Sequence, residues 1–235
     1  MKSIHHLSGS RGHSNYGWLD THYTFSFANY YDPERVHFGM LRVLNDDLIG
    51  GGGGFDLHPH DNMEIVTIVL EGDLEHKDNM GHTMVIRPGE VQVMSAGTGI
   101  LHSEYNKSPD HPVQLLQIWV FPGKKNITPR YDQKAFDPAA RRNRWQVLVS
   151  PDAPGSLRLN QQTWFSRITL DESRTTGYTL HDERHGAYIF ILDGQTEVEG
   201  FPLEKRDGLG LSDVPSFSLK ALKKSEILVI EVPMQ

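Results

Sequence analysis

The 235-residue sequence contains no cysteine, which excludes a disulfide framework and any metal site built on thiolates. It has no apolar run long enough to cross a membrane as a helix, so no membrane partner is expected. Residues 1–7 also lack the apolar core of a signal peptide. Cytoplasmic residence is therefore the expected localisation.

An excess of basic residues is absent as well. Lysine and arginine number 23 against 30 aspartate and glutamate residues, which gives a formal net charge of −7. A general nucleic-acid binder is usually basic, so no direct contact with nucleic acid is expected. The chain instead has 22 glycines and 13 prolines spread along its length, a composition typical of many short strands joined by turns.

Short runs of β-branched and aromatic residues predict an all-β fold. The clearest runs lie at residues 64–70, 84–87, 91–94 and 113–121. A further strand is expected at 36–48, with the polar triplet 45–47 turning the chain at its end. The polar stretch 124–144 is expected to link two domains and to hold a short helix near Pro138.

The second half of the sequence repeats the first. The segment 177–183 echoes 54–60 at a spacing of 123 residues, and Pro233 echoes Pro122 at a spacing of 111 residues. A spacing that shrinks along the chain indicates a duplicated unit with shorter loops. Two strand-rich barrels in tandem are therefore expected, each a double sheet with a tapered interior.

Two pairs of potential metal ligands lie in strand-like segments of the first half. They are His58 with His60, and His102 with Glu104. Alternate side chains of a strand share a face, so each pair points in one direction. If the two segments are neighbouring strands, three imidazoles and one carboxylate converge on a site that suits a divalent transition metal.

Two other residues compete for a place at this site. Glu64 has the same parity as His58 and His60, so a strand continuing through it would place its carboxylate on the same face. From the residues alone, Glu64 and Glu104 are therefore alternative ligands. His76 either lines the same pocket or is a structural histidine.

The second half of the chain has lost most of these ligands. His181 matches His58, but Glu183 stands in place of His60, and residues 214–220 contain neither histidine nor carboxylate. His185 shares the parity of His181 and Glu183, which permits only a weak adventitious site. The second barrel is expected to be a scaffold or a contact surface.

These segments resemble a known family. The first cupin motif is similar, with slight alteration, to the pattern formed by Gly54, His58, His60, Glu64 and Gly72. The second is similar to that of Gly89, Ser95, Ala96, Gly97, His102 and Asn106. The chain resembles the pirin family more closely still, through TFSFANYYDP (24–33), LRVLNDD (41–47), HPH (58–60) and MSAGTG (94–99). The match is dense from Gly12 to about Tyr131 and thin beyond it.

The resemblance implies a bicupin, with two cupin (jelly-roll-like) β-barrels in tandem and one metal ion. Residues 1–123 would form the N-terminal metal-binding barrel, 124–144 the linker and 145–235 a degenerate C-terminal barrel. The implied ligands are His58, His60, His102 and Glu104. Glu64 is then left as a carboxylate beside the ligands or in the pocket.

Bacterial pirin-like proteins of this length include quercetin 2,3-dioxygenases. The resemblance therefore implies an oxidoreductase that opens the central ring of flavonols such as quercetin, consumes dioxygen and releases carbon monoxide. Glu104 would be both metal ligand and catalytic base. The expected cofactor is one divalent transition metal, Fe(II) first, with Cu, Ni, Co, Mn or Zn also suited to the donors. The chain is expected to be a monomer.

Two other functions stay open. Some pirins act as transcription cofactors, which would make this chain a metal-dependent regulatory binding protein. It would act through a protein partner, because nothing in the sequence resembles a DNA-reading motif. The third function is that of a cupin acting on another substrate, such as a sugar or a small keto acid.

Overall fold

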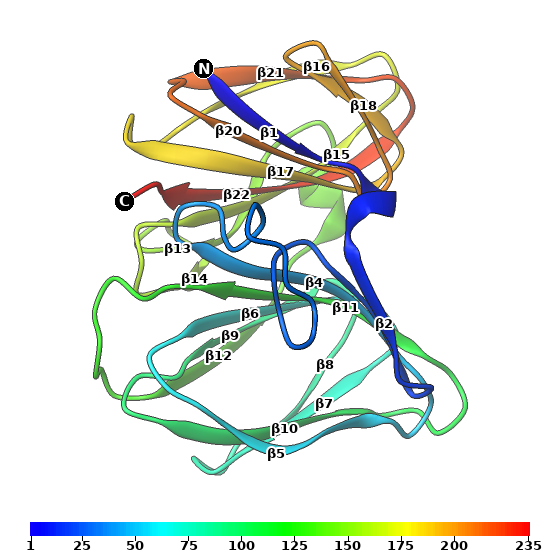
Figure 1. The fold of residues 1–235 in the computed structure, drawn as a ribbon, viewed down its shortest axis with the longest axis vertical. Helices are drawn as coiled ribbons and strands as arrows, with labels where there is room; N and C mark the ends of the chain where they lie inside the picture. Colours follow the sequence, from blue (N-terminus) through cyan, green and yellow to red (C-terminus); the bar gives the residue numbers. More distant parts are fainter.

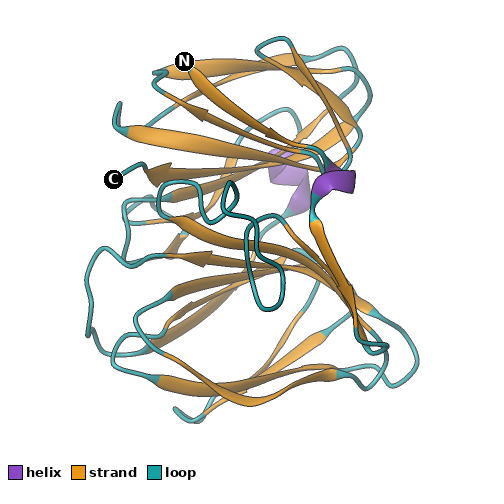
Figure 2. Cartoon of the chain, in the orientation of Figure 1, coloured by secondary structure: helices purple, strands orange, loops and turns teal.

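The computed structural model describes residues 1–235 and consists of strands joined by loops (Figure 2). Its only helical segments are two single-turn 3₁₀ helices, η1 (Ser8–Ser10) and η2 (Pro138–Arg141). The short helix expected near Pro138 is therefore present. Neither segment is long or apolar enough to span a membrane.

The N-terminal barrel is built from two sheets. In spatial order, the larger sheet contains β12 (Arg130–Ala135), β9 (Glu90–Ser95), β6 (Glu64–Glu71), β11 (Val113–Val120), β4 (Leu41–Ile49), β3 (Leu19–Tyr23) and β2 (Gly12–Asn15). The smaller sheet contains β5 (Gly54–His60), β10 (Ile100–Asn106), β7 (Leu74–Asp78) and β8 (Thr83–Ile86).

The C-terminal barrel repeats this arrangement. Its larger sheet contains β1 (Lys2–His6), β20 (Gly208–Ser212), β17 (His185–Asp193), β22 (Ser225–Pro233), β15 (Trp164–Leu170), β13 (Gln146–Ser150) and β14 (Leu157–Arg158). Its smaller sheet contains β16 (Thr175–Thr179), β21 (Ser216–Ala221), β18 (Gln195–Val198) and β19 (Phe201–Glu204). The two barrels stack along the long axis of the molecule (Figure 1). The prediction of an all-β fold with two tandem barrels is confirmed.

Each large sheet has an edge strand from outside the stretch of chain that was expected to form its barrel. β1 pairs antiparallel with β20, from Lys2 opposite Ser212 to His6 opposite Gly208. β12 lies within the stretch expected to be a linker and pairs along its length with β9. The boundaries 1–123, 124–144 and 145–235 stay a prediction, but β1 from the first stretch completes the C-terminal sheet and β12 from the second completes the N-terminal sheet.

Side chains alternate between the two faces of each large sheet, and those on the facing sides form the contact between the barrels. In β11, Leu116 and Ile118 point towards the second barrel and belong to a core of 23 buried residues between the two large sheets. Gln117, of opposite parity, points into the N-terminal barrel, where it contacts Glu104. Burying each large apolar side chain contributes about 1.5–3 kcal/mol, so this shared core holds the barrels together.

The two barrel interiors differ in polarity. The C-terminal barrel encloses an apolar core of 17 residues, whereas the N-terminal barrel contains smaller apolar clusters of 7 and 4 residues. The buried polar side chains of the N-terminal half include Asp47, Thr67, His76, His102 and Glu104. Burying such groups costs free energy unless they are paired, so stability alone does not explain this polar interior, and a binding site there is indicated.

The prediction of a turn at residues 45–47 is wrong. Asn45, Asp46 and Asp47 are buried in the middle of β4. Asp46 lies between two guanidinium groups, with Arg11 Nη1 at 3.4 Å and Arg206 Nε at 2.8 Å. These long-range partners override the local turn preference of Asn and Asp, which a sequence window cannot show.

Candidate metal centre

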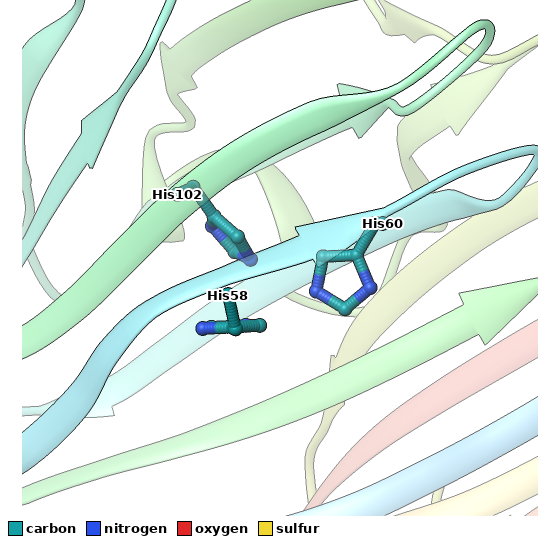
Figure 3. A group of neighbouring side chains, drawn as sticks. All are labelled: His58, His60 and His102. Atoms are coloured by element: carbon teal, nitrogen blue, oxygen red, sulfur yellow. The ribbon is translucent and has the colours of Figure 1, made fainter.

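β5 and β10 are neighbouring antiparallel strands, and His58 lies directly opposite His102. His60, two residues along β5, points towards the same space (Figure 3). The ring centroids are 4.4 Å apart for His58 and His102 and 4.9 Å apart for each pair that includes His60. Nitrogens of all three rings lie within 4.8 Å of one another, so the structure brings the three imidazoles together.

Glu104 joins this cluster through His102. The register between β5 and β10 shifts between His102 and Glu104. A carboxylate oxygen of Glu104 therefore lies within 4.8 Å of ring nitrogens of His102 and His76, and it does not form such a group with His58 and His60. Gln117 Nε2 donates a hydrogen bond to Glu104 Oε2 at 2.9 Å. The other oxygen, Oε1, is buried without a hydrogen-bond partner.

The outer nitrogens of two of the rings are held by their surroundings. His58 Nδ1 donates to the carbonyl of Asp56 at 2.7 Å. His102 Nδ1 lies 3.4 Å from His76 Nδ1, and His102 Nε2 is buried with no partner. Contacts of this kind fix the tautomer and the direction of metal-binding imidazoles. His76 thus lies beside His102 in the interior.

Glu64 lies elsewhere. The prediction that one strand continues from His60 through Glu64 is wrong, because β5 ends at His60 and Glu64 begins β6 in the other sheet. Its carboxylate accepts hydrogen bonds from Ser95 Oγ at 2.8 Å and from the backbone amide of Asn160 at 3.2 Å. Glu64 therefore ties β9 to the segment leading into β15.

Burial sets the protonation of the cluster. It lowers the pKa of His60 to about 4 and that of His102 to about 2, with the charge of His58 acting in the same direction. It raises the pKa of Glu104 to about 7. His60 and His102 are thus neutral at pH 7, the form that binds metal, and a cation beside Glu104 would favour its ionised form.

The donor set fits a divalent transition metal. His102 Nε2 and Glu104 Oε1 are buried without a hydrogen-bond partner, which costs about 1–3 kcal/mol for each atom. Imidazoles with a carboxylate suit first-row metals from manganese to zinc. The residues present therefore fit the expected cofactor without selecting one metal.

Sequence reasoning missed three residues around this cluster. Gln117 orients Glu104, Asp78 lies 3.2 Å from His76 Nε2, and Trp119 packs edge-to-face on His60 at 4.9 Å. Gln117 had a usable signal, because it is a polar residue at an interior position of a strongly apolar strand. Asp78 and Trp119 had none, since only the pairing of distant strands brings them to the histidines.

The corresponding place in the C-terminal barrel is arranged differently. The His181 ring stacks on Trp164 at 4.2 Å, and its Nδ1 lies 2.7 Å from the buried carboxylate of Glu231. His185 Nδ1 reaches the same carboxylate at 2.9 Å. Glu183 is exposed, and no group of three metal-capable side chains within 4.8 Å comes from this barrel.

A surface hollow of about 1170 Å³ also belongs to this half of the molecule. Its walls include Lys2, His185 and Met234 and none of the proposed ligands. Donor chemistry, rather than cavity size, thus distinguishes the histidine cluster in the N-terminal barrel.

Comparison with known proteins adds to this geometry. Residues 5–120 match the family model described as Pirin, and residues 147–232 match the model described as Quercetinase C-terminal cupin domain. Quercetin 2,3-dioxygenase of Escherichia coli K12 is 44% identical over 227 residues, which cover 96% of each chain. A pirin-like protein of Caulobacter vibrioides is 38% identical over 222 residues, covering 94% of this chain and 95% of that protein.

Solved structures agree with the sequence comparisons. The crystal structure of YhhW from Escherichia coli superposes with a TM-score of 0.95 at 42% identity, covering 99% of this chain and 98% of that one. The structure of the bacterial pirin YhhW in complex with nickel(II) gives a TM-score of 0.93 at 41% identity, covering 99% of both chains. The chain therefore belongs to the pirin family.

Proposed function

We propose that this chain is a metal-dependent dioxygenase that opens the central ring of flavonols such as quercetin and releases carbon monoxide. The observation that carries the proposal is the convergence of His58, His60 and His102 beside Glu104, a buried carboxylate with one free oxygen. Near-full-length relatives named quercetin 2,3-dioxygenase support the substrate class. A related pirin structure containing nickel supports a transition metal in this fold. Fe(II) is our first choice among the metals that suit the donors.

His58, His60, His102 and Glu104 would hold the ion. When bound, the metal supplies Lewis acidity, which lowers the pKa of a hydroxyl group that reaches it. Glu104 would accept the proton of the flavonol 3-hydroxyl as general base. Gln117 keeps Glu104 in place by donating to Oε2, and Thr67 Oγ1 in turn donates to Gln117 Oε1 at 3.0 Å.

Aromatic side chains beside the histidines would receive the flat flavonol rings. Trp119 packs against His60, and Phe27 packs edge-on against Trp119 at 5.2 Å. The Phe55 ring lies with its centroid 6.3 Å from that of His58. Apolar walls with a few convergent polar groups are typical of small-molecule sites. The buried, unpartnered Trp119 Nε1 is available to donate to a flavonol oxygen.

The test measures the flavonol absorbance band of quercetin over time, in the presence and absence of dioxygen. The protein is loaded in turn with Fe, Mn, Co, Ni or Cu. We expect loss of the band, with carbon monoxide released, only when metal and dioxygen are both present. The variant His58→Ala with His60→Ala is the matched control and should be inactive. No oxygen-dependent loss with any of Fe, Mn, Co, Ni or Cu would contradict the proposal and favour a regulatory protein that binds a protein partner.

A further inference from the structure

A second group of metal-capable side chains lies on the hairpin of β2 and β3, outside the proposed active site. His13 lies directly opposite His22 across the hairpin, and Asn15 lies opposite Asp20. Opposed residues of an antiparallel pair share a face, so these four side chains point the same way. The two imidazole rings stack with centroids 4.5 Å apart and planes inclined by 22°.

Asp20 lies beside the two imidazoles. Its Oδ1 is 2.8 Å from His13 Nε2 and 3.8 Å from His22 Nδ1. Its Oδ2 accepts a hydrogen bond from Asn15 Nδ2 at 3.0 Å, which fixes the direction of the carboxylate. Two nitrogens and one oxygen therefore lie within 4.8 Å of one another.

We propose that His13, Asp20 and His22 form a second binding site for a divalent transition metal, independent of the site in the barrel. Two imidazoles and a carboxylate suit Zn(II), Ni(II) and Cu(II). The side chains of His13, Asp20 and His22 are 50, 36 and 39% exposed, so an ion enters directly from solvent. With three protein ligands the ion keeps water in its remaining positions and exchanges freely, unlike a closed structural site.

The hairpin holds these ligands on an anchored strand. Leu19, Thr21 and Tyr23 alternate with the ligands of β3 and are buried on its other face. In the turn, the Trp18 ring packs edge-on against Phe55 at 5.1 Å. Ligands on rigid strands need little reorganisation to bind. β2 is the edge strand of its sheet, so an ion at this site would tie it to β3.

The experiment uses the full chain with His58→Ala and His60→Ala, which removes two of the four proposed barrel ligands and leaves the hairpin intact. Calorimetric titration with zinc chloride should show one equivalent bound. Adding Asp20→Asn and His22→Gln should weaken this binding by at least about tenfold, since two direct ligands are lost. Adding His111→Gln instead, at an exposed histidine without an ion-pair partner, should leave it unchanged.

A second readout uses the wild-type chain. Zinc should shift or broaden the imidazole proton signals of His13 and His22 in NMR spectra and leave those of His111 unchanged. This measurement decides the question even if a substituted chain fails to fold. The proposal is overturned if the chain with His58→Ala and His60→Ala binds no zinc, or if adding Asp20→Asn and His22→Gln to it leaves the zinc affinity unchanged. It is also overturned if the His13 and His22 signals do not respond to zinc. None of these outcomes depends on flavonol turnover.

Discussion

The Nδ1 atom of His102 lies 3.4 Å from the Nδ1 atom of His76, and the Nε2 atom of His102 is buried without a partner. Behind His76, Asp78 Oδ2 lies 3.2 Å from His76 Nε2 and 2.8 Å from His82 Nδ1. A row of side chains thus runs inward from the half-exposed His82 to His102. It determines which nitrogen of His102 is free for a ligand.

His76→Phe should weaken metal binding by about 10–100-fold, although His76 is not one of the proposed ligands. The phenyl ring still fills the space beside Tyr131 but cannot hold the His102 nitrogen. Competition of the protein with a chelator for nickel measures the affinity. His5→Phe, at an exposed histidine of β1 in the other barrel, is the control and should have no effect. An unchanged affinity in His76→Phe would refute this positioning role.

Glu104→Gln should reduce flavonol turnover by more than about 100-fold at full metal occupancy, because the charge and the general base are lost together. Steady-state kinetics with parallel metal analysis measures the effect. Glu64→Gln is the matched control, since the Glu64 carboxylate accepts hydrogen bonds from Ser95 in β9 and from the Asn160 amide in the segment leading into β15. If Glu64→Gln loses turnover and Glu104→Gln does not, the base has been misassigned.

Much of the fold could be predicted from local pattern and repetition. The run at 64–70 became β6, and the shrinking repeat spacing predicted the two tandem barrels. The positions of β1 and β12 at the edges of the large sheets could not be predicted, because they depend on pairings such as that of residues 2–6 with residues 208–212. Nothing within either segment specifies a partner so far away in sequence.

The site was predictable where strand alternation applied and failed where the strand ended. His58, His60 and His102 converge because β5 and β10 pair in regular register from His60, opposite Ile100, to His58, opposite His102. Glu64 has the same parity as His58, but the chain crosses to the other sheet before it, so parity says nothing about its direction. The polar run at 45–47 reads as a turn locally, yet it lies buried in β4 through partners distant in sequence.

Asp47→Asn should change how stability depends on pH. Burial raises the pKa of the Asp47 carboxyl from 3.8 to about 7. Between these values the folded chain binds the extra proton, so the free energy of unfolding falls as pH rises through this window. The variant cannot ionise and should be more stable than wild type at pH 8, by up to a few kcal/mol, with little difference at pH 4. Urea denaturation of both metal-free proteins at each pH is the measurement, and equal differences at both pH values would contradict the account.

Phe165→Ala should destabilise both barrels together. Phe165 is fully buried in the core shared by the two large sheets, and removing a buried phenyl group costs about 3–5 kcal/mol. Circular dichroism and metal release from the N-terminal barrel should both shift to lower urea concentration. Leu222→Ala, at a residue 41% exposed, is the control and should shift neither. Metal release at the wild-type urea concentration would show that the barrels are stable independently.

The most direct test of the metal site is anomalous diffraction from crystals loaded with one equivalent of nickel. We predict a strong peak in the N-terminal barrel, within about 2.0–2.2 Å of imidazole nitrogens of His58, His60 and His102 and of a carboxylate oxygen of Glu104. A peak bound by Glu64 in place of Glu104, or no strong peak beside His58 and His60, would contradict this prediction.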